Sequence, residues 1–140
     1  FADLPSRRCL VVFPGFGIPT AEAYREAGAR LTDARRSRRI YGFGAWSPLP
    51  LTGWGPAEND FERVVFARWP ELARVKGRLL RAGAETASLT GSGSALFALF
   101  DSALLLSRAL RVVPAGWQIF RTRTLSRAEY LRLLFEGSDE

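Results

Sequence analysis

The chain contains no histidine, no methionine and a single cysteine, Cys9. These absences exclude a zinc site built from His or Cys ligands, and they exclude Ser-His-Asp and Cys-His nucleophiles. One cysteine cannot form an internal disulfide framework and favours a reducing, cytoplasmic location. Because methionine is missing, we do not expect Phe1 to be the start of a translated chain.

Long apolar runs and complete nucleotide-binding loops are also missing. No stretch approaches the roughly 18 residues that span a membrane, and no signal-peptide pattern opens the sequence, so we expect no membrane partner. Lys76, the only lysine, does not follow a Walker A loop. Neither Gly15-x-Gly17 nor Gly91-x-Gly93 is completed by the third glycine of a dinucleotide fingerprint.

Most of the formal net charge of +6 comes from one short stretch. Between residues 30 and 39, five arginines and one aspartate contribute +4. Such a run is typical of a solvated loop, with attraction of a polyanion or a substrate phosphate as the alternative. The neighbouring Tyr41-Gly-Phe-Gly-Ala-Trp46 lacks the leading basic residue of an RNA-binding motif and lies among prolines, so we expect no nucleic-acid partner.

The order of periodic segments predicts the fold. We expect one domain over residues 1–140, with an irregular connection over 28–57. The expected elements are a strand over 10–13, a short helix over 21–27, helices beginning at Asn59 and Pro70, strands over 86–90 and 95–100, a helix capped by Asp101 or Ser102, a strand over 117–122, and a C-terminal helix opened by a Ser126–Glu129 capping box.

Without the short helix and the C-terminal helix, and with the helices that begin at Asn59 and Pro70 counted as one helical segment, this order is β-α-β-β-α-β. It predicts an α+β, ferredoxin-like (split β-α-β) fold, in which a four-stranded antiparallel sheet carries its helices on one face. The strand over 95–100 is apolar on both faces, so we expect it at the centre of the sheet.

The most distinctive motif joins the two middle strands and consists of Gly91, Ser92, Gly93 and Ser94, here called the Gly-Ser turn. Glycine permits a positive φ or the close approach of another group, and we expect one of these at Gly93. Successive N–H groups in such a turn can bind an anion. A plain hairpin connection is the alternative interpretation.

Four segments in this order and spacing carry a family resemblance: residues 11–24, 59–62, 66–80 and 89–97. The first holds a strand, a Pro-Gly turn and a Pro-Thr helix start, the second reads Asn-Asp-Phe-Glu, and the last contains the Gly-Ser turn. Together they resemble the C-terminal half of the GHMP-superfamily kinases that act on 4-diphosphocytidyl-2-C-methyl-D-erythritol.

The resemblance implies phosphorylation of the 2-hydroxyl of that small-molecule substrate, with ATP and Mg²⁺, in non-mevalonate isoprenoid biosynthesis. It implies that the catalytic Lys and Asp and the main phosphate loop belong to an N-terminal domain absent from this chain. The chain itself then holds no catalytic residue and no metal ligand, and that domain is its partner. By position, Tyr24 matches an aromatic that stacks on cytosine, Thr20 matches a threonine near the reaction centre, and the Gly-Ser turn lies beside the ATP phosphates.

Structural roles stay open for each of these residues. Tyr24 could be a core aromatic, Thr20 a helix N-cap, and the Gly-Ser turn a support for the other domain. The stretch over 30–56 shows no family pattern, so substrate contacts there are not assigned.

For the chain as a whole, the alternative is a self-standing ferredoxin-like ligand-binding or interaction module. Another GHMP kinase, such as a homoserine or mevalonate kinase, is disfavoured by the segment from Ile18 to Tyr24.

Overall fold

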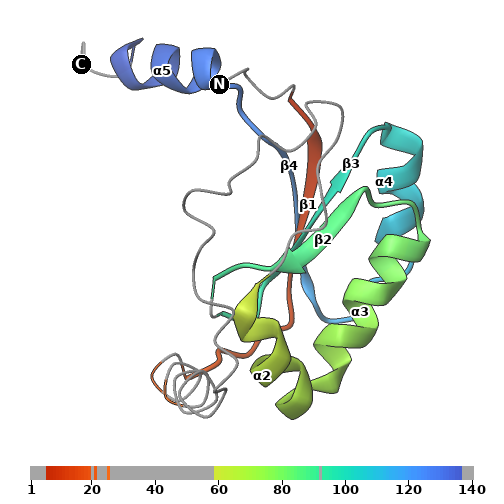
Figure 1. Ribbon diagram of the computed structural model, residues 1–140. Helices are drawn as coiled ribbons and strands as arrows, with labels where there is room; N and C mark the ends of the chain where they lie inside the picture. The colour runs from red at the N-terminus through yellow and green to blue at the C-terminus, as the bar shows by residue number, and fades with distance from the viewer. Residues whose placement is uncertain (1–5, 20, 22–24, 26–58, 92, 137–140) are drawn as a thin grey trace, which may run out of the picture.

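A computed structural model describes residues 6–19, 21, 25, 59–91 and 93–136 (Figure 1). The short helix predicted over 21–27 lies almost entirely outside these residues, and the connection predicted over 28–57 lies wholly outside them. The elements in chain order are β1 (Arg8–Phe13), α2 (Asp60–Arg68), α3 (Pro70–Arg81), β2 (Thr86–Leu89), β3 (Leu96–Phe100), α4 (Ala103–Leu110), β4 (Gln118–Arg123) and α5 (Arg127–Glu136).

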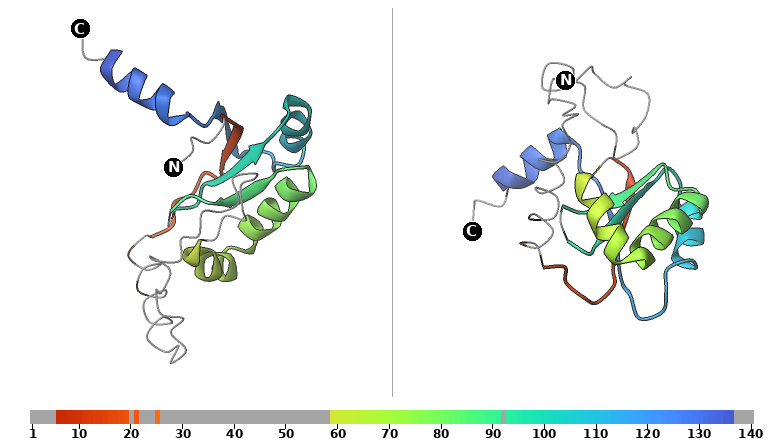
Figure 2. Two further views of the ribbon diagram at one scale, coloured as in Figure 1. Left: turned by 45° about the horizontal axis from the view of Figure 1, so that its top comes forward. Right: turned by 60° about the horizontal axis from the view of Figure 1, so that its bottom comes forward.

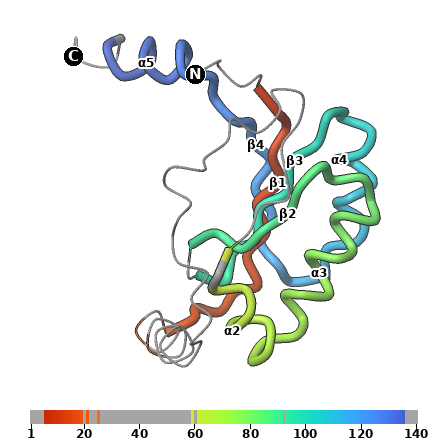
Figure 3. Tube along the Cα trace, in the orientation of Figure 1, coloured from red at the N-terminus to blue at the C-terminus, as the bar shows by residue number. Residues whose placement is uncertain are grey.

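The four strands form one sheet in the order β2-β3-β1-β4, and every neighbouring pair is antiparallel. This is the predicted ferredoxin-like arrangement, with α3 and α4 on the same face of the sheet (Figure 1). The prediction that β3 is central is confirmed, because β3 lies between β2 and β1. The first and last strands of the chain, β1 and β4, run side by side (Figure 3).

The core lies between the sheet and its helices. Side chains alternate along a strand, so Leu10 and Val12 of β1 share a face with their register partners Ala98 and Leu96 of β3. The helices add apolar side chains to the same cluster, and these fully or almost fully buried residues are Val65, Leu72, Val75, Leu79, Leu106 and Ala109. Burial of a full aliphatic side chain stabilises a fold by about 1.5–3 kcal/mol, so this layer supplies most of the stability.

Local signals begin and end the helices where the sequence predicts. Asn59 is the N-cap of α2, Pro70 opens α3, and Ser102 caps α4 by accepting a hydrogen bond from the Leu105 N–H. At α5, the Ser126 hydroxyl accepts from the Glu129 N–H, and the Glu129 carboxylate accepts from the Ser126 N–H. A hydrogen bond from Arg123 to the same carboxylate lowers the pKa of Glu129.

Two further properties follow from burial and helix length. Cys9 is only 8% exposed, and this burial raises the pKa of its thiol. The thiol is therefore protonated and unreactive near neutral pH.

Among the described residues, no helix combines the length and the apolar character needed to cross a membrane.

Gly83 ends α3 in a Schellman motif. Its N–H donates to the Leu80 carbonyl, the Ala84 N–H donates to the Leu79 carbonyl, and the φ of Gly83 is 103°. A Cβ at Gly83 would lie 2.7 Å from the Leu105 side chain, so glycine is needed here for both conformation and space.

We expect Gly83→Ala to lower the free energy of unfolding by about 2 kcal/mol or more, since left-handed strain and overpacking add. Gly116→Ala is the matched control, because Gly116 also has a positive φ, 85°, but nothing lies within 4 Å of its Cβ position. The control is expected to lose about 1 kcal/mol from strain alone. Urea denaturation of both variants measures the difference, and equal losses would show that Leu105 imposes no steric limit.

Candidate functional site

One end of the sheet brings together three of the segments that carry the family resemblance. In the register, Val12 near the end of β1 is opposite Leu96, and Leu89 at the end of β2 is opposite the same residue. The segment that follows β1, the Gly-Ser turn and the start of α2 therefore meet at this end, which lies near α2 in Figure 1. The side chains that connect them come from Asn59, Glu62 and Ser94.

Asn59 connects the start of α2 to the end of β2. Its Oδ1 accepts from the Phe61 N–H at 3.0 Å, which is the cap interaction. Its Nδ2 donates to the carbonyls of Leu89 and Gly91, at 2.9 and 2.7 Å. The amide therefore fixes the first residue of the Gly-Ser turn relative to the helix.

Glu62 lies one turn into α2 and connects three elements. Its Oε1 accepts hydrogen bonds from the Ser88 hydroxyl and the Leu89 N–H, both at 2.9 Å. Its Oε2 accepts from Lys76 Nζ of α3 at 2.5 Å. The Glu62 and Lys76 side chains are 14% and 20% exposed, so this ion pair is largely shielded from water.

Together, Asn59 and Glu62 protect the edge of the sheet. β2 is an edge strand, and an unpaired edge N–H or carbonyl is costly when it is buried. Glu62 satisfies the N–H of Leu89, and Asn59 satisfies its carbonyl. The sequence predicts a helix that begins at Asn59 but no role for Glu62, Lys76 or Ser88, because their meeting depends on the tertiary fold.

Ser94 connects the Gly-Ser turn to the segment after β1. The residue is 3% exposed, and its hydroxyl donates a hydrogen bond to the Phe16 carbonyl. The Phe16 ring in turn stacks on Trp69, with centroids 6.4 Å apart, and the Arg68 guanidinium lies 5.0 Å from the centre of the Trp69 ring. The α2–α3 junction thus supports this segment as well.

The glycines at this end differ from the sequence prediction. Gly91, not Gly93, has the left-handed conformation, with φ 53°, so the expectation of a positive φ at Gly93 is wrong, while the close approach of another group there stays a prediction. The Gly93 N–H donates to the Thr90 carbonyl at 3.1 Å and so is already used within the turn. At Gly91 and Gly15, no atom of the described residues lies within 4 Å of the Cβ position, which leaves the backbone open within this part of the chain.

Of the residues predicted for the site, Gly91, Gly93 and Ser94 lie together in the Gly-Ser turn. Thr20, Tyr24 and Ser92 lie outside the described residues, so their predicted roles stay predictions. The described part of the chain holds no group of three or more His, Cys, Asp or Glu side chains suited to a metal ion. What this end can offer chemically is an open glycine backbone held by polar contacts, most of them partly buried.

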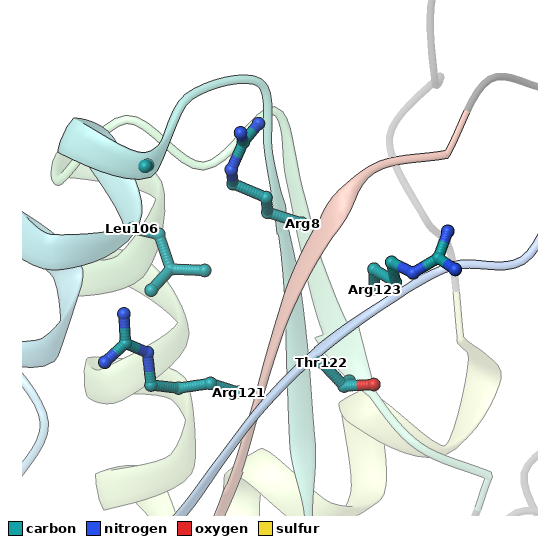
Figure 4. A pocket seen from close by; sticks show the side chains of 6 residues that line it. Arg8, Leu106, Arg121, Thr122 and Arg123 are labelled. Carbon is teal, nitrogen blue, oxygen red and sulfur yellow. The ribbon is translucent and has the colours of Figure 1, made fainter.

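A separate groove of about 390 Å³ lies toward the other end of the sheet, between α4, β1 and β4. Arg8, Leu106, Arg121, Thr122 and Arg123 line it, together with Ala103, and Figure 4 shows Arg8 and Arg121 directed toward the side of Leu106. Arg8 donates to the Asp101 carbonyl, and Arg123 pairs with Glu129. Because Arg8 is the first residue of β1, the groove is separate from the three segments described above.

Comparison with known proteins identifies the class. The family model described as GHMP kinases C terminal matches residues 50–118, and the described fold is that of the matched domain. The chain belongs to the GHMP kinases and carries their C-terminal domain. The resemblance carried by the four sequence segments is thereby confirmed.

Within this class, the similar relatives are 4-diphosphocytidyl-2-C-methyl-D-erythritol kinases. The one from Solibacter usitatus (strain Ellin6076) is 38% identical over 137 residues, covering 94% of this chain and 42% of the relative. The one from Chlorobium luteolum (strain DSM 273 / BCRC 81028 / 2530) is 40% identical over 113 residues, covering 77% of this chain and 38% of the relative. The chain thus spans less than half the length of these relatives.

Solved structures agree with this assignment. A crystal structure of 4-(cytidine 5'-diphospho)-2C-methyl-D-erythritol kinase matches 87% of this chain and 44% of its own, with a TM-score of 0.60 and 25% identity. The mevalonate kinase of L. major, solved with R-mevalonate, matches 90% of this chain and 44% of its own, with a TM-score of 0.59. At 15% identity the second likeness shows the fold alone.

Asn59→Asp tests the contact between α2 and the Gly-Ser turn. Aspartate is a good N-cap, but here its second oxygen would face the carbonyls of Leu89 and Gly91 in place of a donor. We expect the free energy of unfolding to fall by about 2 kcal/mol, because two hydrogen bonds are replaced by repulsion. Chemical denaturation monitored by circular dichroism measures this change.

Ser102→Asp is the control for that variant. The Ser102 hydroxyl caps α4 by accepting from the Leu105 N–H, a role that aspartate also fills. We expect a change within about 0.5 kcal/mol there. If Asn59→Asp is as stable as the unaltered chain, the amide of Asn59 does not hold the turn.

Proposed function

We propose that this chain is the substrate-binding C-terminal part of an ATP-dependent kinase that phosphorylates the 2-hydroxyl of 4-diphosphocytidyl-2-C-methyl-D-erythritol. The observation that carries the proposal is the meeting of three family segments at one end of the sheet. Asn59 and Ser94 bind the Gly-Ser turn to α2 and to the segment after β1. The name shared by the similar relatives supports the choice of substrate.

The Gly-Ser turn fits a place beside the phosphates of ATP. Phosphates bind where a glycine backbone is open to close approach, and among the residues that the structure describes no atom lies within 4 Å of the Cβ positions of Gly91 and Gly15. Ser94 and Gly93 are engaged inside the protein, so their role is to hold the turn in shape. When bound, ATP supplies the phosphoryl group and Mg²⁺ offsets its charge.

The family resemblance assigns the remaining parts. It implies that the catalytic Lys and Asp and the main phosphate loop belong to an N-terminal domain, where we expect Mg²⁺ to bind as well. In the proposed reaction the substrate hydroxyl attacks the γ-phosphorus of ATP, ADP leaves, and the hydroxyl proton passes to a base of that domain. This chain contributes Tyr24, which stacks on the cytosine, and Thr20, which orients a phosphate or substrate oxygen.

The isolated chain is expected to show no turnover with ATP, Mg²⁺ and the cytidyl substrate, since phosphoryl transfer needs the charged groups of the other domain. Fusion of the preceding part of the Solibacter usitatus relative to residue 1 is expected to restore ATP-dependent formation of the 2-phosphate, detected by coupled ADP release and by ³¹P NMR. Turnover by the isolated chain would refute the division of roles. A folded fusion that leaves this substrate unchanged would refute the function.

Tyr24 tests substrate recognition in the same fusion. Tyr24→Ala is expected to weaken binding of the cytidyl substrate by about 1–3 kcal/mol, the contribution of one stacked base. Tyr24→Phe keeps the ring face and is expected to bind the substrate almost normally, which makes it the matched control. Calorimetric titration measures both affinities, and an unchanged Kd in a folded Tyr24→Ala variant would contradict stacking.

A further inference from the structure

The groove between α4, β1 and β4 carries a positive charge that the proposed function does not use. Among the described residues that line it, three are arginines and none is acidic. We call it the arginine groove, and its lining consists of Arg8, Arg121, Arg123, Ala103, Leu106 and Thr122. Its volume of about 390 Å³ lies within the range of small-molecule sites, about 300–1,000 Å³. The groove is therefore large enough for a small anion.

The strand register places the three arginines on the face of the sheet that packs against the helices. Arg8 is opposite Arg123, and Arg121 is opposite the core residue Leu10. Because side chains alternate along a strand, these four positions share one face. Burial favours an apolar residue beside Leu10, and like charges directly opposite each other are destabilising. The arginines thus reduce the stability of the sheet, which indicates a role other than folding.

Two of the three arginines have no acidic partner in the described part of the chain, and these are Arg8 and Arg121. The carboxylate of Asp101 pairs with Arg7 at 3.3 Å, so Arg8 binds only the Asp101 carbonyl, at 3.0 Å. A guanidinium has five N–H donors, and Arg8 therefore keeps donors for a ligand. The charge of the third arginine is balanced by Glu129, at 2.7 Å.

Arg8 and Arg121 are placed to bind one anion together. They are diagonal neighbours on adjacent strands, and such neighbours are about 7–8 Å apart. In Figure 4 both are directed toward the side of Leu106, whose side chain lies between them. A guanidinium binds a phosphoryl group through two parallel hydrogen bonds, so two guanidinium groups at this spacing suit two linked phosphoryl groups.

We propose that the arginine groove is a binding site for the diphosphate group of a small organic molecule. Arg8 binds one phosphoryl group and Arg121 the other, while Ala103 and Leu106 form an apolar wall beside them. The groove is separate from the Gly-Ser turn, which contacts the start of α2, because α2 and α4 lie on either side of α3 in Figure 2. The proposal does not depend on the function proposed above.

Titration of the full 140-residue chain with inorganic diphosphate, followed by NMR, tests this site. At physiological ionic strength, the amides of Leu106 and Thr122 are expected to shift saturably. Arg121→Gln is expected to raise the Kd about tenfold or more, because hydrogen bonds between charged groups are lost. Arg121 is exposed, so the variant is expected to fold normally. Arg111→Gln is the matched control, since Arg111 is an exposed arginine that ends α4 outside the groove, and its Kd is expected to stay within about twofold.

The second arginine and the choice of anion test specificity. Arg8→Gln is expected to raise the Kd as Arg121→Gln does. Inorganic phosphate engages one guanidinium and is expected to bind about tenfold or more weakly than diphosphate. Methyl diphosphate and ADP distinguish the sources of the group. Equal Kd values for the two support recognition of the diphosphate alone, and tighter binding of ADP in the groove supports a nucleotide as the ligand.

Three results would overturn the proposal. The first is the absence of a saturable shift at Leu106 and Thr122 with any of these compounds. The second is an equal Kd for Arg121→Gln and the unaltered chain. The third is an equal Kd for sulfate, phosphate and diphosphate, which would show general attraction of anions by exposed arginines. None of these results bears on the proposed kinase function, because binding of ADP beside the Gly-Ser turn is detected separately at the amides of Gly91 and Gly93.

Discussion

The carboxylate of Glu62 binds three groups that come from α3, from the side chain of Ser88 and from the backbone of Leu89. Its removal would leave a shielded ammonium and an edge N–H without their acceptor, which is costly in a largely buried setting. This one group fixes the polar side of α2 against the sheet, while Val65 packs into the core on its apolar side. The cap residue Asn59 and the Gly-Ser turn take their places from α2, so the candidate site depends on Glu62 indirectly.

The candidate site is therefore a set of backbone segments fixed by polar side chains behind them. Glu62 and Asn59 act from the helix, and Ser94 acts from within the turn. This division suits a phosphate-adjacent role, because the backbone of glycine faces the open side, while Ser94 is buried and Glu62 and Asn59 are partly buried behind it. Reactive side chains are not needed in such a segment if the partner domain supplies them.

Much of the fold could be predicted from the sequence because its signals are local. Pro70, Gly83, Ser102 and the Ser126–Glu129 pair mark helix ends through contacts within a few residues. The triple contact of Glu62 could not be predicted, because Ser88 is 26 residues away and its approach depends on the packed sheet. The positive φ of Gly91, rather than of Gly93, could not be predicted for a similar reason. Hydrogen bonds within the folded turn decide which of the two glycines adopts it.

The pairing of β1 with β4 has a consequence for synthesis on the ribosome. β1 is made first, but its partner β3 begins at Leu96 and its other partner, β4, ends at Arg123. The helices and the β2–β3 hairpin can form from neighbouring residues, whereas both edges of β1 must wait for distant ones. During translation, Leu10 and Val12 therefore belong to a strand that stays unpaired until β3 has left the exit tunnel and keeps one free edge until β4 follows.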